Sequence, residues 1–382
     1  MCFFSELVIM AMLISGIGTA APASRIPQMD AYSAMSNTCC DSDEHRRVME
    51  MIYQGSGVKH RGSVLVGAEP EDFIRADDRD EFFFYERENE EDYGPSTQER
   101  MRQYEQHALP LAIKSSVAAL RDAGQDAREI THIVTVSCSG FNSPGVDMGL
   151  IEELGLNRNT SRTHVGFMGC HGSFNGLRVA HGYTASDPDA VVLMCSVELC
   201  SLHHHYGWTT DKVIANALFA DGSGAVICRS SKIEDRKPAY QLIRSGSFLV
   251  PNTKFAMSWR IGNHGFEMTL SQKVPALIEE NLVSWLTPFL AREGLTIKDI
   301  AGWAIHPGGP RILDSCLAAL SLSNSHVAPA REVLEKHGNM SSSTILFVLD
   351  RMREEKINGP VVALGFGPGL AIEAMLLKAE NV

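Results

Sequence analysis

A strand and helix pattern that occurs twice constrains the fold of this chain more than any other feature of its sequence. In LRDAGQDAREI (120–130), a leucine, a glycine and an isoleucine mark a helix end, its stop and the start of an apolar strand. LAREGLTIKDI (290–300) has the same three residues at the same spacing. Similarity in both order and spacing predicts that the chain is built from two related α/β units.

A second pair of matches follows these segments. Cys170 precedes an apolar strand by 21 residues, and Asn339 precedes another by 22. Each of these two residues follows a glycine and opens a predicted helix. We therefore divide the chain into homologous halves, 1–235 and 236–382, and expect a mostly parallel sheet in each. A pseudo-twofold relation between the halves would bring Cys170 and Asn339 to equivalent helix starts that face one cleft.

Composition and charge exclude several classes of protein. A chain of 382 residues with 44% hydrophobic residues can bury a substantial core, as a globular protein does. The formal net charge of −12, without a basic stripe, argues against a nucleic-acid partner. No apolar run reaches the roughly 20 residues that span a bilayer. The nine cysteines lack metal-site spacing, so we expect reduced thiols, a cytoplasmic protein and no bound metal.

Two segments in the first quarter of the chain carry local signals. The N-terminal run of apolar and small residues is partly typical of a signal peptide, but Glu6 interrupts it and no basic region precedes it. We predict instead a strand that runs into a turn at 16–22. The charged segment 75–96 predicts a surface insertion anchored by phenylalanines. Ser96 or Thr97 then begins a long amphipathic helix.

Cys170 is the strongest candidate for a reactive side chain. It lies between the apolar strand THVGFMG and a segment with helical spacing of apolar residues, so it occupies a strand-to-helix turn. The helix N-terminus there favours a thiolate, and Gly169 and Gly172 allow a sharp turn and close approach of a substrate. The alternative reading of a free cysteine is a small core residue. We assign that reading to Cys195 and Cys228, which lie inside apolar strands.

A nucleophilic thiolate needs an imidazole nearby. His306, in WAIHPGGPRIL, lies at the carboxyl end of an apolar strand, where α/β active sites gather their residues. The histidine triplet at 203–205 is the rival, and we interpret it as a polar loop without partners spaced to bind a metal. Asn339 fits a plain helix N-cap as well as a role in the site.

These residues fall in motifs that together resemble one family. The motifs are GFMGCHGSFNGLRVA, ALFADGSGAVI, AIHPGGPRILD, HGNMSSSTILFVLD and the terminal GFGPGLAIE. In this order, from about residue 12 to the C-terminus, they resemble the type III polyketide synthases, the chalcone synthase-like branch of the thiolase-fold condensing enzymes. The resemblance implies a thiolase fold, in which duplicated α/β halves form five layers in the order αβαβα.

The resemblance also implies roles for individual residues. Cys170 would carry the acyl group, with His306 and Asn339 completing a Cys-His-Asn triad. Phe219 matches the gatekeeper phenylalanine between the CoA tunnel and the acyl cavity. The second gatekeeper of the plant enzymes falls on Met268, which should leave a softer and wider passage.

Further positions match the family's cavity wall and glycine-rich loop. The bulk of Trp259 is expected to shorten one arm of the cavity, where the plant enzymes have glycine. The positions expected to line or shape the cavity are Cys138, His203, Trp259, Ser341, Gly367 and Pro368.

The family's basic CoA-binding positions fall near Val48, Met51 and Gly55, none of which is cationic. Phosphates need cationic contacts, so other side chains must replace them, unless these are ordinary surface charges. The candidates are Arg46, Arg47, Lys59, Arg61 and Arg311.

The implied reaction uses an acyl-CoA starter and malonyl-CoA, with no cofactor beyond these CoA thioesters. Decarboxylation of malonyl-CoA gives an enolate that attacks the acyl group on Cys170, and the extended chain cyclises to a pyrone or resorcinol-type product. We expect an aliphatic starter, with acetyl or malonyl starters left open. The family is homodimeric, and 139–150 matches the segment that reaches toward the partner's cavity, with Ser143 where plant enzymes have methionine.

Three alternatives are weighed against this reading. A ketoacyl-ACP synthase of the type III class shares the fold and triad but performs one condensation with an acyl-carrier protein. Chemistry like that of HMG-CoA synthase needs a glutamate general base in the cleft, and the sequence does not place one. A non-catalytic thiolase-fold scaffold would not be expected to keep all three reactive residues in intact motifs.

Overall fold

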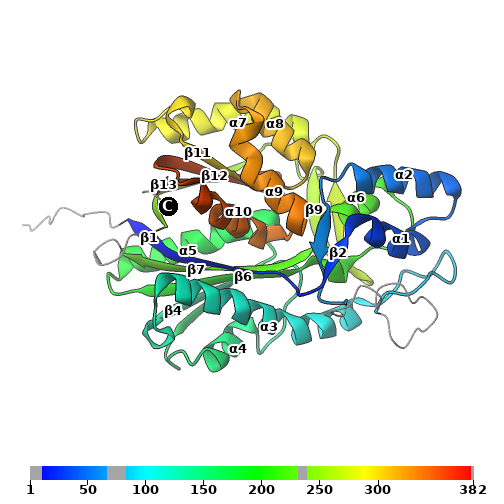
Figure 1. Cartoon of the computed structure of the whole chain (residues 1–382), viewed down its shortest axis with the longest axis horizontal. Helices are drawn as coiled ribbons and strands as arrows, with labels where there is room; N and C mark the ends of the chain where they lie inside the picture. The colour runs from blue at the N-terminus through cyan, green and yellow to red at the C-terminus, as the bar shows by residue number, and fades with distance from the viewer. Residues whose placement is uncertain (1–10, 67–82, 231–238, 380–382) are drawn as a thin grey trace, which may run out of the picture.

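The computed structural model describes residues 11–66, 83–230 and 239–379. Its secondary structure forms five layers in the order αβαβα (Figure 1). In this view α7 (Val274–Ala291) and α8 (Pro310–Leu320) cover one layer of strands, and α3 (Thr97–Ala123) and α4 (Val146–Glu153) cover the other. Helices α5 and α10 lie between the two layers of strands. This is the thiolase-fold arrangement that the sequence predicted.

Nine strands form one hydrogen-bonded sheet, whose two halves meet where β1 pairs with β8. The order β11-β12-β13-β8 in one half matches the order β4-β6-β7-β1 in the other, and β5 extends the second half at the edge. The duplication is therefore visible in the topology. The strands are β1 (Met12–Ala20), β4 (His132–Ser137), β5 (Ser161–Gly166), β6 (Val191–Leu199), β7 (Asp221–Ser230), β8 (Tyr240–Leu249), β11 (Gly302–Ile305), β12 (Gly359–Gly367) and β13 (Ala371–Ala379).

The expectation of a mostly parallel sheet is wrong. Only the pairs β4·β5, β4·β6 and β11·β12 are parallel, and the other five pairings in the sheet are antiparallel. The reason is that each half ends in two strands that are adjacent in both chain and sheet. Neighbours of this kind, such as β12 and β13 with a short connection, need no crossover helix and pair antiparallel.

The start of α3 and the glycine stops after α3 and α7 agree with the sequence-based prediction. Ser96 caps α3 in a reciprocal capping box with Glu99. Gly124 ends α3 in the left-handed conformation, and Gly294 follows the end of α7 with the same sign of φ. A short 3-10 turn then leads into β4 or β11. The predicted repeat of a helix, a glycine stop and a buried strand is therefore observed in both halves.

The two central helices carry the candidate site. α5 (Gly172–Ser186) follows a 3-10 turn at Gly169–His171, and α10 (Thr344–Met352) follows one at Ser341–Ser343. One hydrophobic core cluster packs α10, part of α5 and the strands on either side of them. Because these helices are enclosed by both strand layers, their N-terminal turns lie in the interior between the halves.

The remaining helices and strands lie outside the nine-stranded sheet and the five layers. They are β2 (Arg25–Pro27), α1 (Gln28–Cys39), α2 (Asp43–Gln54), β3 (His60–Gly62), α6 (Thr210–Leu218), β9 (Met257–Gly262), β10 (Gly265–Leu270) and α9 (Ala328–His337). None of the helices in the described part of the chain is both long and apolar enough to span a membrane.

The local predictions near the N-terminus have mixed outcomes. The strand that runs into a turn at 16–22 is confirmed, since β1 ends at Ala20 and lies inside the sheet. Glu6 and residues 75–82 of the predicted insertion lie outside the described residues. In the part of the insertion that is described, Phe83 and Phe84 are half-buried and line a cavity.

Candidate active site

The three predicted reactive residues line one cavity of about 480 Å³. Cys170 comes from the turn before α5, His306 follows β11, and Asn339 lies between α9 and the turn before α10. All three side chains are buried. The pseudo-twofold arrangement predicted for Cys170 and Asn339 explains this meeting, since each precedes the central helix of its own half. The structure therefore places the triad together, and its catalytic roles stay a prediction.

Burial dominates the chemistry of Cys170. It raises the pKa of the thiol to about 11, while hydrogen bonds from the Ser341 hydroxyl and the Asn339 side chain act in the opposite direction. The turn around the thiol needs its glycine, because Gly169 has φ +78° and a Cβ there would lie 2.4 Å from Cδ of Pro368. Ser341 and Asn339 can thus donate to a negative charge on sulfur, although burial favours the protonated thiol.

His306 is a buried imidazole without a partner among the described residues. Its backbone N–H donates to the Leu364 carbonyl oxygen at 2.8 Å, which fixes the residue at the end of β11. Both ring nitrogens lack a hydrogen-bond partner in the described part of the chain, and burial lowers the pKa of the ring to about 3. Burial thus favours the neutral form of both the thiol and the imidazole. This differs from the thiolate expected from the helix N-terminus, because desolvation outweighs the helix dipole here.

Asn339 is oriented by its own backbone turn. Its Oδ1 accepts the N–H of Ser341 at 2.9 Å, as an N-cap side chain does. The N-cap reading and the site reading are therefore compatible: the cap occupies the oxygen and leaves the amide NH₂ as the donor toward Cys170. Ser341 has φ +47°, a strained conformation for a serine, which fits a position constrained by the site.

A small pocket of about 20 Å³ lies beside Cys170, and Phe219 and Met268 line both this pocket and the larger cavity. Met268 and Trp259 are direct partners across the β9–β10 hairpin, so both side chains point to the same face of the ribbon. The indole N–H of Trp259 donates to the Cys138 carbonyl oxygen at 2.7 Å. Trp259 thus lies in the wall of the pocket, and its effect on the length of the cavity stays a prediction. Cys138, Trp259, Ser341 and Pro368 all line the pocket.

Glu198 lies in the same small pocket and was missed from the sequence. Its carboxylate accepts the backbone N–H groups of Cys138 and Ser139 at 2.9 and 3.0 Å. It also accepts the Ser139 hydroxyl at 2.7 Å and the Ser342 hydroxyl. Burial raises the pKa of Glu198, and these hydrogen bonds oppose that shift. The available signal was a single acidic residue inside an otherwise apolar strand. Its four bonds make it a brace for the pocket wall.

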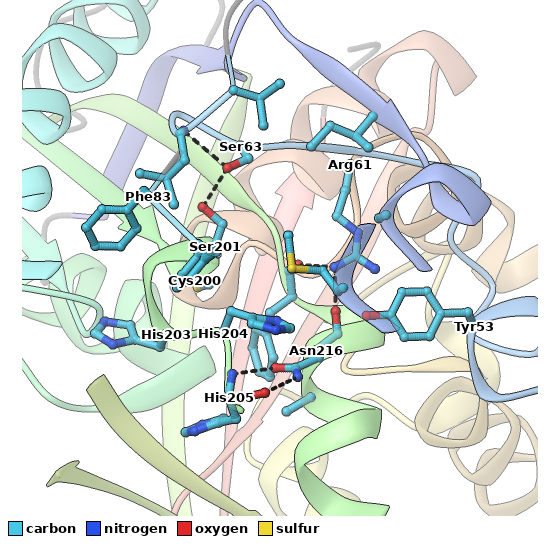
Figure 2. Close-up of a pocket in the computed structure, with 18 of the residues that line it drawn as sticks. Tyr53, Arg61, Ser63, Phe83, Cys200, Ser201, His203, His204, His205 and Asn216 are labelled. Carbon is cyan, nitrogen blue, oxygen red and sulfur yellow. Dashed lines mark hydrogen bonds between the residues drawn. The ribbon is translucent and has the colours of Figure 1, made fainter. Parts of the chain in front are cut away.

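The histidine triplet is not a polar loop, and this prediction is wrong. His203, His204 and His205 are all buried, and they line a second cavity of about 110 Å³ (Figure 2). His203 bonds the Ser139 carbonyl oxygen through Nε2 at 2.6 Å and accepts the Phe266 N–H at Nδ1. Its ring stacks on Phe266 with centroids 4.2 Å apart. In the described residues no group of three or more histidine, cysteine or acidic side chains is placed to hold a metal ion.

The second cavity is adjacent to the small pocket, and the two have walls in common. Cys200, Phe219 and Trp259 line both. Its apolar lining comes from β2, α1, the segment after β3 and the phenylalanines of the insertion, and Arg61, Asn216 and the histidine triplet line it as well. The apolar residues include Ile26, Ala31, Met35, Leu65, Val66, Phe83 and Phe84.

The glycine-rich segment at the end of β12 contacts the turn that holds Cys170. Pro368 lines the small pocket, whereas Gly367 lines none of the three cavities. A Cβ at Gly367 would lie 2.2 Å from Cδ2 of His171, the residue after the candidate nucleophile. Glycine at 367 therefore lets β12 approach the turn that holds Cys170.

The five cationic candidates lie in different settings. Arg311 is exposed and lines the large cavity, together with Val48 and Met51 of α2 and Gly55, which caps that helix. Arg47 is exposed and adjacent to Val48. The other three are engaged elsewhere: Arg46 bonds Ser36 and Asn37, Lys59 pairs with Glu335, and Arg61 is buried among carbonyl groups.

Comparison with known proteins agrees with the fold and the cavity. Models of the N-terminal and C-terminal domains of chalcone and stilbene synthases match residues 9–232 and 241–380. An "Alpha-pyrone synthesis polyketide synthase-like Pks18" from Mycobacterium tuberculosis is 32% identical, with 95% of this chain and 90% of that protein covered. "Type III polyketide synthase A" of Arabidopsis thaliana is 29% identical, with 95% and 91% covered. The crystal structure of PKS-I from the brown alga Ectocarpus siliculosus superposes with a TM-score of 0.89 at 28% identity, covering 98% of this chain and all of that one.

Fold and cavity together define a thiolase-fold acyltransferase. The chain belongs to the chalcone and stilbene synthase family, the type III polyketide synthases, which use acyl-CoA and malonyl-CoA. The resemblance inferred from the five motifs is confirmed.

Proposed function

We propose that this enzyme loads an acyl-CoA starter onto Cys170 and extends it by repeated decarboxylative condensation with malonyl-CoA. The observation that carries the proposal is the shared cavity of Cys170, His306 and Asn339. As the thiol attacks the thioester carbonyl, its proton passes to the unpartnered imidazole of His306. The acyl group forms a new thioester with Sγ, and the CoA thiol leaves with a proton.

His306 and Asn339 then serve the extension step. Malonyl-CoA loses carbon dioxide and leaves an enolate, whose oxygen is stabilised by the His306 ring N–H and the Asn339 NH₂. One donor of this kind typically lowers the activation free energy by about 3 kcal/mol. The enolate carbon attacks the acyl carbonyl on Cys170, so the chain grows by two carbons and the thiolate is released. An amide at position 339 suits this step because a carboxylate would repel the enolate.

We assign entry of CoA to the open side of the large cavity. Arg311 lies there, at the start of α8, and offers a planar fork of donors for phosphate. Arg47 is the second exposed cation near this side. Because the uncharged Val48 and Met51 line the same cavity, the contact with CoA would be less cationic than in relatives with basic residues at these positions.

The starter tail is proposed to extend from the small pocket into the second cavity. The two share Cys200, Phe219 and Trp259, and the second cavity is lined mainly by apolar groups. Its volume of about 110 Å³ matches a short aliphatic tail better than a long one. We therefore propose an aliphatic starter and a pyrone or resorcinol-type product, of which the name of the mycobacterial relative favours an α-pyrone.

The working unit is proposed to be a homodimer. Strand β5 lies at the edge of the nine-stranded sheet. Phe141, Met148 and Met168 are exposed large apolar residues, and the first two belong to the segment 139–150. An apolar surface beside an open sheet edge is typical of a protein interface. We further propose that the enzyme needs no cofactor besides its CoA substrates, and that it acts in the cytoplasm, consistent with the free state of the eight described cysteines.

One experiment tests the proposal as a whole. The purified enzyme is incubated with malonyl-CoA and a panel of acyl-CoA starters without carrier protein, and products are identified by mass spectrometry. We expect products extended by two or more malonyl units. A single condensation that requires acyl-carrier protein would support the ketoacyl-ACP synthase alternative instead. No acylation of Cys170 and no alkylation by iodoacetamide would support a non-catalytic scaffold.

A further inference from the structure

Arg61 is a buried arginine whose hydrogen bonds are all made within the protein. It lies in β3, and its side chain reaches toward the end of α6 beside the ring of Tyr53 (Figure 2). Nε and Nη2 both donate to Oε1 of Gln28, at 3.0 and 2.6 Å. Nη2 also donates to the Ala217 carbonyl oxygen at 3.0 Å, and Nη1 donates to two further carbonyls. No donor is left for a phosphate.

The carbonyls that Arg61 binds are those of the last turn of α6. Nη1 donates to the Asn216 oxygen and, at 3.1 Å, to the Phe219 oxygen. These groups have no partner within their own helix, which ends at Leu218. A cation at this end also opposes the partial negative charge of the helix C-terminus. Arg61 is thus a side-chain cap for α6, although it lies 155 positions before Asn216 in the chain.

The capped turn is joined directly to the segment of Asn339. The N–H of Asn339 donates to the Leu218 oxygen at 2.8 Å, and the N–H of Ala220 donates to the Asn339 oxygen at 2.9 Å. Phe219 and Asn339 form a parallel bridge through these bonds. The fit is close, since a Cβ at Gly338 would lie 3.1 Å from the Leu218 oxygen and 3.6 Å from Cβ of Arg61.

We propose that Arg61 is a positioning residue that fixes Phe219 and, through the bridge, Asn339 relative to Cys170. It would thereby set both starter selectivity and the efficiency of malonyl-CoA decarboxylation. This inference rests on the proposed roles of Phe219 and Asn339. It also replaces the sequence-based assignment of Arg61 to CoA binding.

Lysine cannot reproduce this cap. The guanidinium presents five N–H donors in one plane, whereas a lysine ammonium has three donors around one point. Arg61→Lys keeps the charge but loses most of the simultaneous bonds to Gln28, Ala217 and Phe219. The carbonyls of the last turn would then be bonded only in part, and the turn would move more freely.

The test compares two half-reactions in the full-length enzyme. Acylation of Cys170 is followed by intact-protein mass spectrometry with a panel of starters, and decarboxylation is followed by release of carbon dioxide from malonyl-CoA. For Arg61→Lys we expect decarboxylation to fall at least tenfold, acylation to fall less than threefold, and the ratio between preferred and poor starters to approach one. Gln28→Leu, which keeps the arginine but removes its bidentate acceptor, should shift both quantities in the same direction by a smaller factor. If Arg61→Lys does not fold, Gln28→Leu still tests the inference.

Leu282→Ala is the control for lost stability alone, because Leu282 is fully buried in α7 and lines none of the three cavities. It should lower both half-reactions by the same factor and leave the starter ratio unchanged. The inference is overturned if the Arg61 and Gln28 variants behave like this control. If the wild type itself does not acylate Cys170, the proposed function fails instead, which is a different outcome.

Discussion

Phe219 and Asn339 lie side by side, bridged by two backbone hydrogen bonds between segments that are more than a hundred residues apart in the chain. One residue stands between the large cavity and the small pocket, and the other directs its amide toward Cys170. The two bonds join Asn339 to Leu218 and Ala220, the residues on either side of Phe219. The backbone of the proposed gate is thus coupled to that of the proposed oxyanion donor, so a shift of one segment would disturb the other.

Removal of the nucleophile is the most direct test. Cys170→Ala should abolish covalent loading of a radiolabelled or mass-tagged starter, because no other thiol combines this position with donors from Ser341 and Asn339. Cys228→Ala is the matched control, since Cys228 is a buried core thiol of β7 that lines none of the three cavities. Equal loading by the wild type and Cys170→Ala would rule out the mechanism.

Loss of the Asn339 amide should separate the two half-reactions. Asn339→Ala is expected to accept the starter but to decarboxylate malonyl-CoA about 10²- to 10³-fold more slowly, as for removal of one oxyanion donor. Asn339→Asp should be at least as slow, because its carboxylate repels the enolate. Release of labelled carbon dioxide measures the step. A variant that loses loading and decarboxylation equally would contradict the assignment of Asn339 to the enolate.

The resting protonation state can be read from the pH dependence of alkylation. Burial raises the pKa of Cys170 to about 11 and lowers that of His306 to about 3, so both are neutral near pH 7. The rate of iodoacetamide modification should then rise roughly tenfold per pH unit between pH 7 and 9, as the thiolate fraction grows. A preformed thiolate and imidazolium pair would instead give a constant rate over this range. His306→Gln serves to show whether the imidazole changes the slope.

Trp259 is expected to limit the space for the growing chain. Its side chain lines both the small pocket and the second cavity, so Trp259→Gly should merge them. We expect longer acyl starters to be accepted and the product distribution to move toward larger products, measured by mass spectrometry with a starter series. Trp208→Gly is a suitable control, because Trp208 lines none of the three cavities. An unchanged product spectrum for Trp259→Gly would mean that the two spaces are not used together.

How much could be read from the sequence depends on whether a feature is local. The glycine stops at 124 and 294 are local signals, because glycine is the usual residue where a helix ends with a left-handed φ. The repeat could be predicted from these two glycines and the residues around them. The meeting of Cys170 with Asn339 followed from the repeat in turn. The bonds of Arg61 could not be predicted, since three of its acceptors are backbone carbonyls that no residue type reveals and the fourth is the side chain of Gln28, far away in the sequence. Glu198 was hidden for a related reason: its partners, Ser139 and Ser342, come from distant segments.

Buried histidines should make the fold sensitive to acid. Burial lowers the pKa of His203, His205 and His306 to about 3 each, and lowers that of His204 as well. In the unfolded chain these rings take up protons near pH 6.5, whereas in the folded protein they stay neutral. The unfolded state therefore binds more protons, and stability is lost as the pH falls below about 6.5 toward the folded-state values.

Each such ring lowers the free energy of unfolding by up to about 1.4 kcal/mol for each pH unit in that window. This is a large share of the total free energy of unfolding of a typical domain, about 5–15 kcal/mol. Asp221 acts in the opposite direction, because burial raises its pKa to about 6 and the folded state then gains a proton below that pH. Burial also raises the pKa of Glu198, which acts in the same direction as Asp221. Two carboxyl groups offset at most two of the four rings, so acid destabilisation should prevail. Urea unfolding at pH 7.5, 6.5 and 5.5 measures the slope. His205→Phe should flatten it by about one ring's share, whereas His60→Gln, at an exposed histidine, should leave it unchanged. A stability that stays constant or rises from pH 6.5 to 5.5 would show that these rings are protonated in the folded protein.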